Sequence, residues 1–302
     1  MREIKHNKII VILGQTSTGK SDFAVEIASK IKGEIISADS RQVYKGMNLG
    51  TGKITKNEMN KIPHHLLDVI TPLKIFTVSD FKKLTDKKIE EIIARGNIPI
   101  LCGGTGFYID TVLNNITLPD VSPNPKLRAR LEKKTNEELF EILEKLDNDR
   151  SKTIDKNNKV RIVRAIEIVK TLGYVPKIEI SNKFNVLKIG LIIPNDKLKT
   201  RINERLLARM KKGMLVEIKN LHNKGLSWKR MEALGLEYRY GAMFLQGKID
   251  KKEMIEKINL ETQHYAKRQK TWFKRDQNTI WIDPRNNKDK TLAYKRIKGF
   301  LK

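Results

Sequence analysis

The feature that most constrains the fold is a glycine-rich segment near the start of the chain. Residues 14–21 read GQTSTGKS, which matches the phosphate-loop pattern GxxxxGK followed by Ser or Thr. A short run of apolar, mostly β-branched residues precedes it at 8–13, and a helical pattern follows from 21 to about 31. A strand, a phosphate loop and a helix in this order predict an α/β fold with a parallel sheet.

The same segment predicts binding of a diphosphate or a triphosphate. Glycines let successive backbone N–H groups point inward, and the following helix presents the positive end of its dipole. The ammonium group of Lys20 would reach phosphate oxygens, and the hydroxyl of Ser21 would ligate Mg²⁺. We therefore expect the whole segment to bind phosphate: Gly14, Gln15, Thr16, Ser17, Thr18, Gly19, Lys20 and Ser21.

Alternating strands and helices predict a P-loop parallel-sheet core with crossover helices. Helical periodicity is expected at 107–113 and at 79–94, where Ser79 would be the N-cap. Helices separate most of the expected strands, so the strands should run parallel. These further strands are 33–37, 98–102, 186–193 and 279–283.

An inserted all-helical subdomain interrupts this pattern. Three prolines follow Leu113, and no strand is expected before 186. The helices expected there lie near 125–134, 136–146 and 157–171. We therefore assign 117–186 to the insertion and both 1–116 and 187–302 to the core. The chain from 196 to 276 is expected to be almost entirely helical, which gives the core a helical C-terminal part.

The charge of the chain favours a polyanionic partner. Its 61 Lys and Arg residues exceed its 35 Asp and Glu residues, a formal net charge of +26. Residues 187–302 alone carry 29 basic and 12 acidic side chains. A base-composition bias of the gene would spread the excess evenly, so this concentration predicts a nucleic-acid surface.

Composition also excludes several classes of protein. The single cysteine, Cys102, excludes an internal disulfide framework and a zinc site of the CxxC type. No apolar run approaches the roughly 18–20 residues of a membrane helix. The first residues lack the pattern of a signal peptide. We therefore expect a cytoplasmic protein without a membrane partner.

Asp39 is the candidate catalytic carboxylate. It follows the strand expected at 33–37, and the carboxyl ends of parallel strands line the ligand crevice of such sheets. The strand at 98–102 instead runs into Gly103, Gly104 and Thr105, without a carboxylate. Asp39 could deprotonate an acceptor, hold Mg²⁺ through water, or merely cap the next turn.

The motifs taken together resemble those of one family, the bacterial-type tRNA dimethylallyltransferases, also called tRNA isopentenyltransferases. The matching segments occur in order and span almost the whole chain. Two departures are visible: Gln15 stands where many members have proline, and 233–241 differs from the usual version, which leaves the roles of Arg230, Arg239 and Tyr240 open. The segments that carry the resemblance are GQTSTGKS (14–21), ISADSRQVYKGMNLGTGK (36–53), PHHLLD (63–68), FTVSDF (76–81), CGGTGFYI (102–109), LRARLE (127–132), VRIVRAIE (160–167) and YAKRQKTWFKRD (265–276).

The resemblance implies a prenyl transfer assisted by Mg²⁺. The phosphate loop would hold dimethylallyl diphosphate, whose dimethylallyl group passes to N6 of the adenosine on the 3′ side of the anticodon, in tRNAs that read codons beginning with U. Asp39 would accept the amine proton. Thr105 would lie near the diphosphate oxygens, and Arg201, preferred over Arg205, would clamp them.

The resemblance also implies a surface for the anticodon stem-loop of tRNA. Asp39, Thr105 and the residues beside Asp39 would contact the extruded adenine and its neighbours. Contacts to the rest of the tRNA would come from the insertion and from the late motif, with Trp272 serving tRNA or the core. The implied tRNA-binding residues are Asp39, Ser40, Arg41, Gln42, Thr105, Arg128, Arg161, Arg164, Lys267 and Arg268. We expect the protein to act as a monomer.

Two other functions fit parts of the sequence. A small-molecule kinase would use the same loop with ATP, and Asp39 would then deprotonate a hydroxyl. A non-catalytic RNA-binding protein could retain a degenerate phosphate site. The adjacent His64 and His65 cannot both face one metal ion from a strand or helix, so we expect a structural or substrate-channel role for them.

Overall fold

The computed structural model describes residues 7–302, which form two compact units. The first unit runs to Asn115 and resumes at Asn182, and the second spans Ile116–Ser181. In chain order, the first unit contains β1 (Lys8–Gly14), α1 (Lys20–Ile31), β2 (Gly33–Ala38), β3 (His64–His65), α2 (Val78–Ala94), β4 (Ile98–Gly103), α3 (Gly106–Leu113), β5 (Asn185–Leu191), α8 (Asn195–Lys211), α9 (Met214–Asn223), α10 (Trp228–Leu234), α11 (Leu236–Leu245), α12 (Lys251–Phe273), β6 (Ile280–Ile282) and α13 (Asn287–Leu301).

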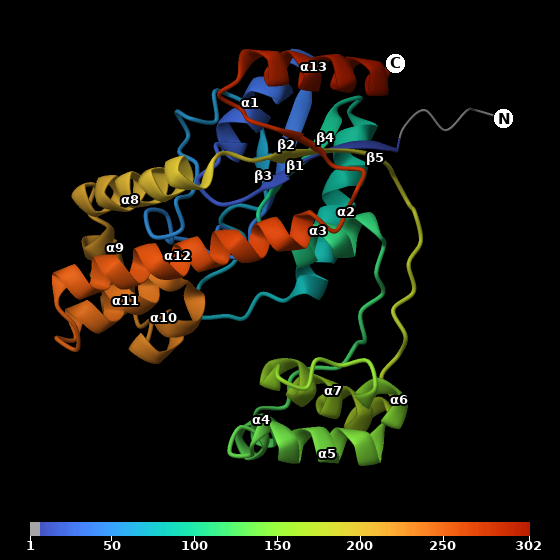
Figure 1. Cartoon of the computed structure of the whole chain (residues 1–302), viewed down its shortest axis with the longest axis vertical. Coiled ribbons are helices and arrows are strands. Elements are labelled where there is room, and N and C mark those ends of the chain that lie inside the picture. Colours follow the sequence, from blue (N-terminus) through green and yellow to red (C-terminus); the bar gives the residue numbers. More distant parts are fainter. Residues whose placement is uncertain (1–6) are drawn as a thin grey trace. The chain divides into compact units, whose positions relative to one another are not determined.

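The first unit is built on one parallel six-stranded sheet, which confirms the predicted α/β class (Figure 1). The strand order is β3-β2-β4-β1-β5-β6, and every neighbouring pair is parallel. β1 therefore lies between β4 and β5, so the loop that follows it opens in the middle of the sheet. β3 was not expected from the sequence, because it consists of two residues at the sheet edge.

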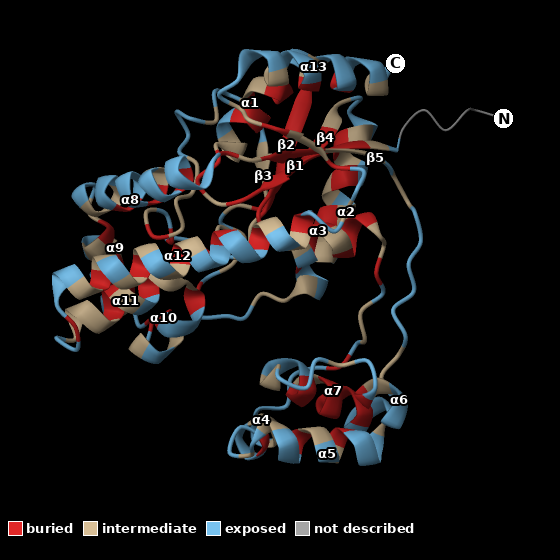
Figure 2. Cartoon of the chain, in the orientation of Figure 1, coloured by how far each residue is buried: buried red, intermediate tan, exposed pale blue. Residues whose placement is uncertain are grey.

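Both faces of the sheet are covered by helices. Ile9, Val11 and Leu13 of β1 pack on the face covered by α2 and α3. The alternate residues Ile10 and Ile12 pack on the opposite face, against α1 and α13. Figure 2 shows the resulting contrast between buried strands and exposed outer helix surfaces. Burial on both faces explains why these strands are continuous apolar runs.

A separate layer of helices, α8 to α12, packs around its own apolar core (Figure 1). Its buried residues include Leu206, Met214, Ile218 and Tyr238. Segment 43–47, which follows β2, contributes Val43, Tyr44 and Met47 to the same core. This layer therefore anchors the loop beyond β2 from outside the sheet.

The second unit is a small helical bundle. Leu139 and Leu143 pack against Ile162 and Ile166 in its apolar core. The buried carboxylate of Glu167 lies beside that core and is 1% exposed. The helices of this unit are α4 (Pro125–Leu131), α5 (Asn136–Leu146), α6 (Asn148–Ser151) and α7 (Lys159–Leu172).

Some element boundaries differ from the sequence predictions. α2 begins one residue earlier than expected, and its N-cap is Thr77 rather than Ser79. The Thr77 hydroxyl accepts a hydrogen bond from the Asp80 N–H, and the Asp80 carboxylate accepts one from the Thr77 N–H, a reciprocal capping box. β5 begins at Asn185, so two residues that we assigned to the insertion lie in the sheet.

Candidate active site

The phosphate loop leaves β1 in a conformation that requires its glycines. Gly14 has φ 139°, and a Cβ atom there would lie 2.4 Å from the carbonyl oxygen of Leu191 on β5. Gly19 has φ 91° and forms the N-cap of α1. Ser17 has φ 62°, a left-handed conformation that is uncommon for a residue with a side chain. The loop therefore curls tightly between the end of β1 and the N-terminus of α1.

Lys20 lies at the start of α1 with its ammonium group over this loop. Its Nζ donates a 2.6 Å hydrogen bond to the carbonyl oxygen of Gln15. Burial, the largest cause, and the positive charge of Arg205 together lower the pKa of Lys20 to about 8, against the opposing effects of Cys102 and Asp39. An anion bound in the loop would reverse this by favouring the charged ammonium.

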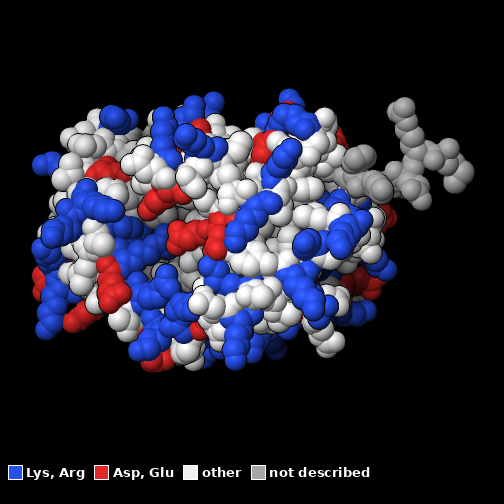
Figure 3. Space-filling view, turned by 90° about the horizontal axis from the view of Figure 1, so that it is seen from above, with Lys and Arg blue, Asp and Glu red and all other residues white. Residues whose placement is uncertain are grey.

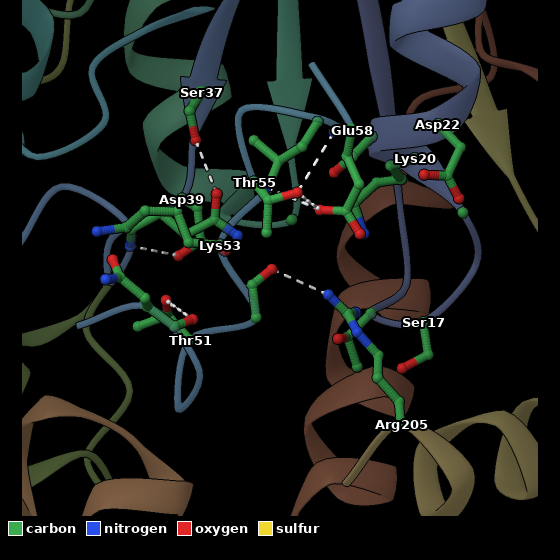
Figure 4. A pocket seen from close by; sticks show the side chains of 18 of the residues that line it. Ser17, Lys20, Asp22, Ser37, Asp39, Thr51, Lys53, Thr55, Glu58 and Arg205 are labelled. Carbon is green, nitrogen blue, oxygen red and sulfur yellow. Dashed lines mark hydrogen bonds between the residues drawn. The ribbon is translucent and has the colours of Figure 1, made fainter. Parts of the chain in front are cut away.

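The loop opens into a cavity of about 550 Å³ (Figure 4). Lys20 and Arg205 lie across the cavity from Asp39 in this view. The lining comes from the phosphate loop, the ends of β2 and β4, segment 48–58 and the part of α8 from Arg201 to its C-cap, Lys212. Both Arg201 and Arg205 line it. The geometry therefore brings both arginine candidates together with five of the eight predicted phosphate-binding residues, whereas Gly14, Gln15 and Thr18 do not line the cavity.

Arg205 is held more firmly than Arg201. Its Nη2 donates a 3.0 Å hydrogen bond to the carbonyl oxygen of Gly52. Desolvation lowers the pKa of Arg205, and the neighbouring charge of Arg209 contributes in the same direction. The preference for Arg201 as the phosphate clamp stays a prediction, because both guanidinium groups face the same cavity.

Asp39 and Thr105 come from neighbouring strand ends. The Asp39 Oδ1 accepts hydrogen bonds from the backbone N–H groups of Arg41 (2.8 Å) and Gln42 (3.3 Å). The Thr105 Oγ1 accepts one from the N–H of Ser40 at 3.2 Å. The loop after β2 and the loop after β4 are therefore tied together, with the second carboxylate oxygen of Asp39 left for other contacts.

A second cavity, of about 290 Å³, adjoins the first. Ser40, Arg41, Tyr265 and Arg268 line this second cavity. The guanidinium of Arg268 lies 5.9 Å from the centre of the Tyr265 ring. Three residues from the predicted site line both cavities: Thr16, Ser17 and Asp39. The two cavities therefore meet at the phosphate loop and at the candidate catalytic carboxylate.

The wall at 48–52 depends on residues that sequence reasoning missed. The carboxylate of Glu217 on α9 accepts hydrogen bonds from the N–H groups of Asn48 (3.0 Å), Leu49 (2.8 Å) and Gly50 (3.1 Å). It also accepts one from the Tyr238 hydroxyl at 2.7 Å. No local pattern around Glu217 signals this role, because its partners lie almost 170 residues away.

Helix α12 holds the phosphate loop through hydrogen bonds to Gln15 and Thr16. The side chain of Gln15 is buried, and its Nε2 donates to the carbonyl oxygen of Ala266 at 3.1 Å. The Gln15 side chain therefore lines neither cavity and leaves the backbone of the phosphate loop open to a ligand. Gln269 on the same helix contacts Thr16 and Gly104 and was missed, although it lies within the late motif. Trp272 packs against Gly106 and donates to Asp110 at 2.9 Å, so it belongs to the core.

The arginines predicted to contact tRNA in the helical unit differ in their surroundings. Arg128 donates two hydrogen bonds to Glu167, and Arg164 donates one to Glu167 and one to the carbonyl of Val121. Burial alone would raise the pKa of Glu167, but these hydrogen bonds hold it at about 2. The Arg161 side chain is exposed. Arg128 and Arg164 therefore have a structural task besides any contact with tRNA.

The two histidines have separate surroundings. His65 contacts the buried carboxylate of Glu34 at 2.6 Å, beside Arg95 and Asn97. Burial by itself would raise the pKa of Glu34, but these partners hold it at about 2. His64 lines the first cavity, and burial lowers its pKa. His65 thus has the structural role that we expected as one possibility.

Two features are absent from the described residues, 7–302: a clustered metal site and a membrane-spanning helix. No group of three or more His, Cys, Asp or Glu side chains in this part of the chain could hold a metal ion. Within it, no helix is long and apolar enough to cross a membrane.

A phosphate loop after the central strand, a carboxylate at the next strand end and two cavities that meet between them define a P-loop α/β enzyme with room for two substrates. The family model described as IPP transferase matches residues 42–276. The chain therefore belongs to the IPP transferase family. That assignment supports prenyl transfer over the alternative function, that of a small-molecule kinase.

Relatives and solved structures agree with this assignment. The chain is 43% identical to tRNA dimethylallyltransferase 2 of Treponema denticola, over 92% of this chain and 95% of the relative. It is 40% identical to tRNA dimethylallyltransferase 2 of Trichlorobacter lovleyi, over 91% and 92%. The full-length tRNA isopentenylpyrophosphate transferase of Bacillus halodurans has a TM-score of 0.75 at 34% identity, covering 98% of this chain and 97% of that one.

A eukaryotic structure is also similar. It is described as a dimethylallyltransferase acting on tRNA, with a TM-score of 0.76 at 28% identity. The match covers 88% of this chain and 70% of that one. The fold is therefore shared with a bacterial and a eukaryotic transferase.

Proposed function

We propose that this protein transfers the dimethylallyl group from dimethylallyl diphosphate to N6 of the adenosine on the 3′ side of the anticodon, in tRNAs that read codons beginning with U. The observation that carries the proposal is the meeting of the two cavities at Asp39. The first cavity offers the phosphate loop to the donor. The second offers the Tyr265 ring and the side chains of Arg41 and Arg268, among others, to an extruded nucleotide.

The reaction follows from the groups at this junction. The N6 amine of the adenosine attacks C1 of the dimethylallyl group, a C–N bond forms, and the bond from C1 to the diphosphate oxygen breaks. The leaving electron pair stays on the diphosphate. The carboxylate of Asp39 accepts the proton that the amine loses. An exocyclic adenine amine is a weak nucleophile, so removal of this proton as the bond forms lowers the barrier.

Stabilisation of the leaving diphosphate falls to the phosphate loop, to α8 and to the loop after β4. Lys20, the backbone N–H groups of the phosphate loop, the hydroxyl of Thr105 and Arg201 supply positive charge and hydrogen bonds to its oxygens. Arg205 faces the same cavity and is the alternative clamp.

Mg²⁺ fits this site in the manner of other phosphate loops. Ser21 and Asp22 both line the cavity, and the remaining ligands of such an ion come from phosphate and water rather than from a carboxylate cluster. Ser21 would hold the ion. When bound, Mg²⁺ neutralises charge on the leaving diphosphate.

Several surface features support binding of the anticodon stem-loop. Lys and Arg side chains are spread over the whole face in Figure 3 and outnumber the acidic groups that lie among them. Lys267 and Arg268 are exposed on α12. In the helical unit, Lys126, Arg130 and Lys170 line a cavity of about 310 Å³ near the buried Glu167. We propose tRNA contacts at these sites and at Arg128, Arg161 and Arg164, with the residues at 39–42 reading the base.

The chain supplies both cavities by itself, which supports action as a monomer. We place the reaction in the cytoplasm, where its tRNA substrate is found.

A donor comparison on one unmodified tRNA tests the proposal. A transcript whose anticodon reads a U-initial codon is incubated with protein, Mg²⁺ and either dimethylallyl diphosphate or ATP, then digested for nucleoside mass spectrometry. Prenylated adenosine should form only with dimethylallyl diphosphate. Asp39→Ala should keep tRNA affinity and lose turnover by about 100-fold or more. Absence of prenylated adenosine from the wild-type reaction, or equal loss of affinity and turnover in Asp39→Ala, contradicts the proposal or its choice of base.

A further inference from the structure

One amide side chain joins the two loops that face the donor diphosphate. Gln269 lies near the C-terminal end of α12 and is 5% exposed. Its Oε1 accepts a 2.7 Å hydrogen bond from the backbone N–H of Thr16 in the phosphate loop. Its Nε2 donates a 2.8 Å hydrogen bond to the carbonyl oxygen of Gly104 in the loop after β4. Both ends of a single planar group are therefore used, one on each loop.

The backbone at Gly104 is matched to this contact. A Cβ atom at that position would lie 2.2 Å from the Nε2 of Gln269, closer than any real Cβ contact. The glycine therefore lets the amide approach the loop directly. The pairing is specific in both directions, because a larger residue at 104 would displace Gln269 and a shorter one at 269 would not reach both loops.

The two loops carry the groups assigned to the leaving diphosphate. Thr16 is followed by the N–H groups that surround the phosphate, and Gly104 is followed directly by Thr105. The hydroxyl of Tyr265, one turn earlier on α12, interacts with the side chains of Thr105 and Gln269. Gln15 adds a second link from the phosphate loop to this helix. The distance between the phosphate cradle and the Thr105 hydroxyl thus depends on α12.

We propose that Gln269 is a positioning residue that fixes the phosphate loop and Thr105 at the separation needed to stabilise the leaving diphosphate. This inference rests on the proposed prenyl transfer. Gln269 is buried and both ends of its amide are engaged by the two loops, so it acts through these loops rather than on the substrate. Donor groups must lie within hydrogen-bonding distance of developing charge, and a displacement of about 1 Å can cost 100-fold in rate.

Two substitutions test the bridge from different directions. Gln269→Ala removes both hydrogen bonds, and kcat should fall 10- to 100-fold while the Kd for tRNA stays within about twofold. Gln269→Glu keeps the shape of the side chain. Its ionised carboxylate can still accept from Thr16 but repels the Gly104 carbonyl, whereas its protonated form donates to that carbonyl as the amide does.

The glutamate variant therefore has a pH signature. The ratio of its kcat to that of the wild type should rise as pH falls from 9 to 6, because the protonated carboxyl restores the bridge. Tyr265 is the titratable side chain that interacts with Gln269, and its pKa of about 12 places it outside this range. Taking the ratio at each pH removes changes that both enzymes share, including those from Lys20.

The matched control is Gln246→Ala. Gln246 is the C-cap residue of α11, and its Nε2 donates to the Ala242 carbonyl of that helix at 3.0 Å. This variant should keep kcat within twofold of the wild type. Folded fraction is measured for every variant by near-ultraviolet circular dichroism at the assay temperature, and kcat is expressed per folded enzyme.

Binding of inorganic pyrophosphate, measured by calorimetry, separates this inference from the proposed function. Gln269→Ala should raise its Kd about tenfold whatever the acceptor is. If the wild type binds pyrophosphate but makes no prenylated adenosine, the function fails while the bridge is still judged by this Kd. The inference is overturned if Gln269→Ala, or Gln269→Glu should the alanine variant not fold, keeps kcat and pyrophosphate affinity within twofold per folded enzyme. A flat pH ratio for Gln269→Glu overturns it as well.

Discussion

Two groups of successive backbone N–H donors lie close together in this protein and have opposite fates. Those at Asn48, Leu49 and Gly50 already bind an anion, the carboxylate of Glu217. Those of the phosphate loop face a cavity, where the Lys20 ammonium donates a hydrogen bond to the Gln15 carbonyl. The difference teaches that such donors hold the chain together when the chain supplies the anion. They form a binding site when it does not.

The largest expected effect comes from Lys20→Ala, which removes charge from the open cradle. We expect kcat/KM for dimethylallyl diphosphate to fall about 100- to 1000-fold, the usual loss when one donor to developing charge is removed. The melting temperature should change little, because burial already disfavours the Lys20 ammonium. Steady-state kinetics and thermal melting measure the two quantities. Lys199→Ala, an exposed position on α8, is the control; a loss of stability without a loss of donor affinity would reverse our assignment of the two cradles.

Glu217→Ala should show the opposite pattern at the filled cradle. Three N–H groups and the Tyr238 hydroxyl lose their acceptor, so the free energy of unfolding should fall by about 2–4 kcal/mol. Denaturant unfolding measures this quantity. Glu256→Ala, an exposed carboxylate on α12, should leave it unchanged within about 0.5 kcal/mol. Equal stability of Glu217→Ala and the control would show that water replaces the carboxylate at no cost.

The pH dependence of donor binding sharpens the comparison further. Lys20 has a pKa near 8 in the free protein, below its ordinary 10.5. Affinity for dimethylallyl diphosphate should therefore be highest below pH 8 and fall by up to about tenfold per pH unit above it, because free Lys20 must gain a proton to pair with the anion. Folding responds in the opposite direction: the lowered pKa makes this group's contribution to stability rise between pH 8 and 10.5. A donor affinity that is constant from pH 7 to 9.5 would exclude this linkage.

The smallest effects are expected in the helical unit, where engaged and exposed arginines lie near each other. Arg161→Ala should weaken tRNA binding two- to fivefold and leave stability unchanged. Arg128→Ala should lower stability as well, by about 1–2 kcal/mol, because Glu167 loses two hydrogen bonds but keeps those from Arg164 and the Asn124 N–H. Filter binding and thermal melting distinguish the two. Identical effects of the two substitutions would mean that the Glu167 ion pair has no structural task.

The sequence predicted the phosphate loop, but it did not predict the second group of N–H donors, at 48–50, which binds Glu217. The glycines and Lys20 of the phosphate loop act within eight consecutive residues, so their spacing carries the information. Asp39 was found because a strand end in a parallel sheet is a local feature with a known location. The open sheet and its helical insertion followed from periodicity for the same reason.

The missed residues share a different property. Gln269 contacts Thr16 across 253 positions, and Glu217 contacts its loop across almost 170. Neither spacing has a periodic signature. Long-range side-chain contacts of this kind become visible only when the fold is known.

The N-cap of α2 was missed for a local reason. Ser79 is a good capping residue, as is Thr77, and the reciprocal hydrogen bonds between Thr77 and Asp80 decide between them.

The position of Cys102 has a consequence for how this protein tolerates oxidants. The residue is the last but one of β4, lines the first cavity and is the single cysteine of the chain. Burial raises the pKa of its thiol to about 12, even with Lys20 nearby. Peroxides and electrophiles react with thiolate, which is therefore scarce here at neutral pH. We expect the donor cavity to survive oxidative stress that inactivates enzymes with exposed, acidic thiols.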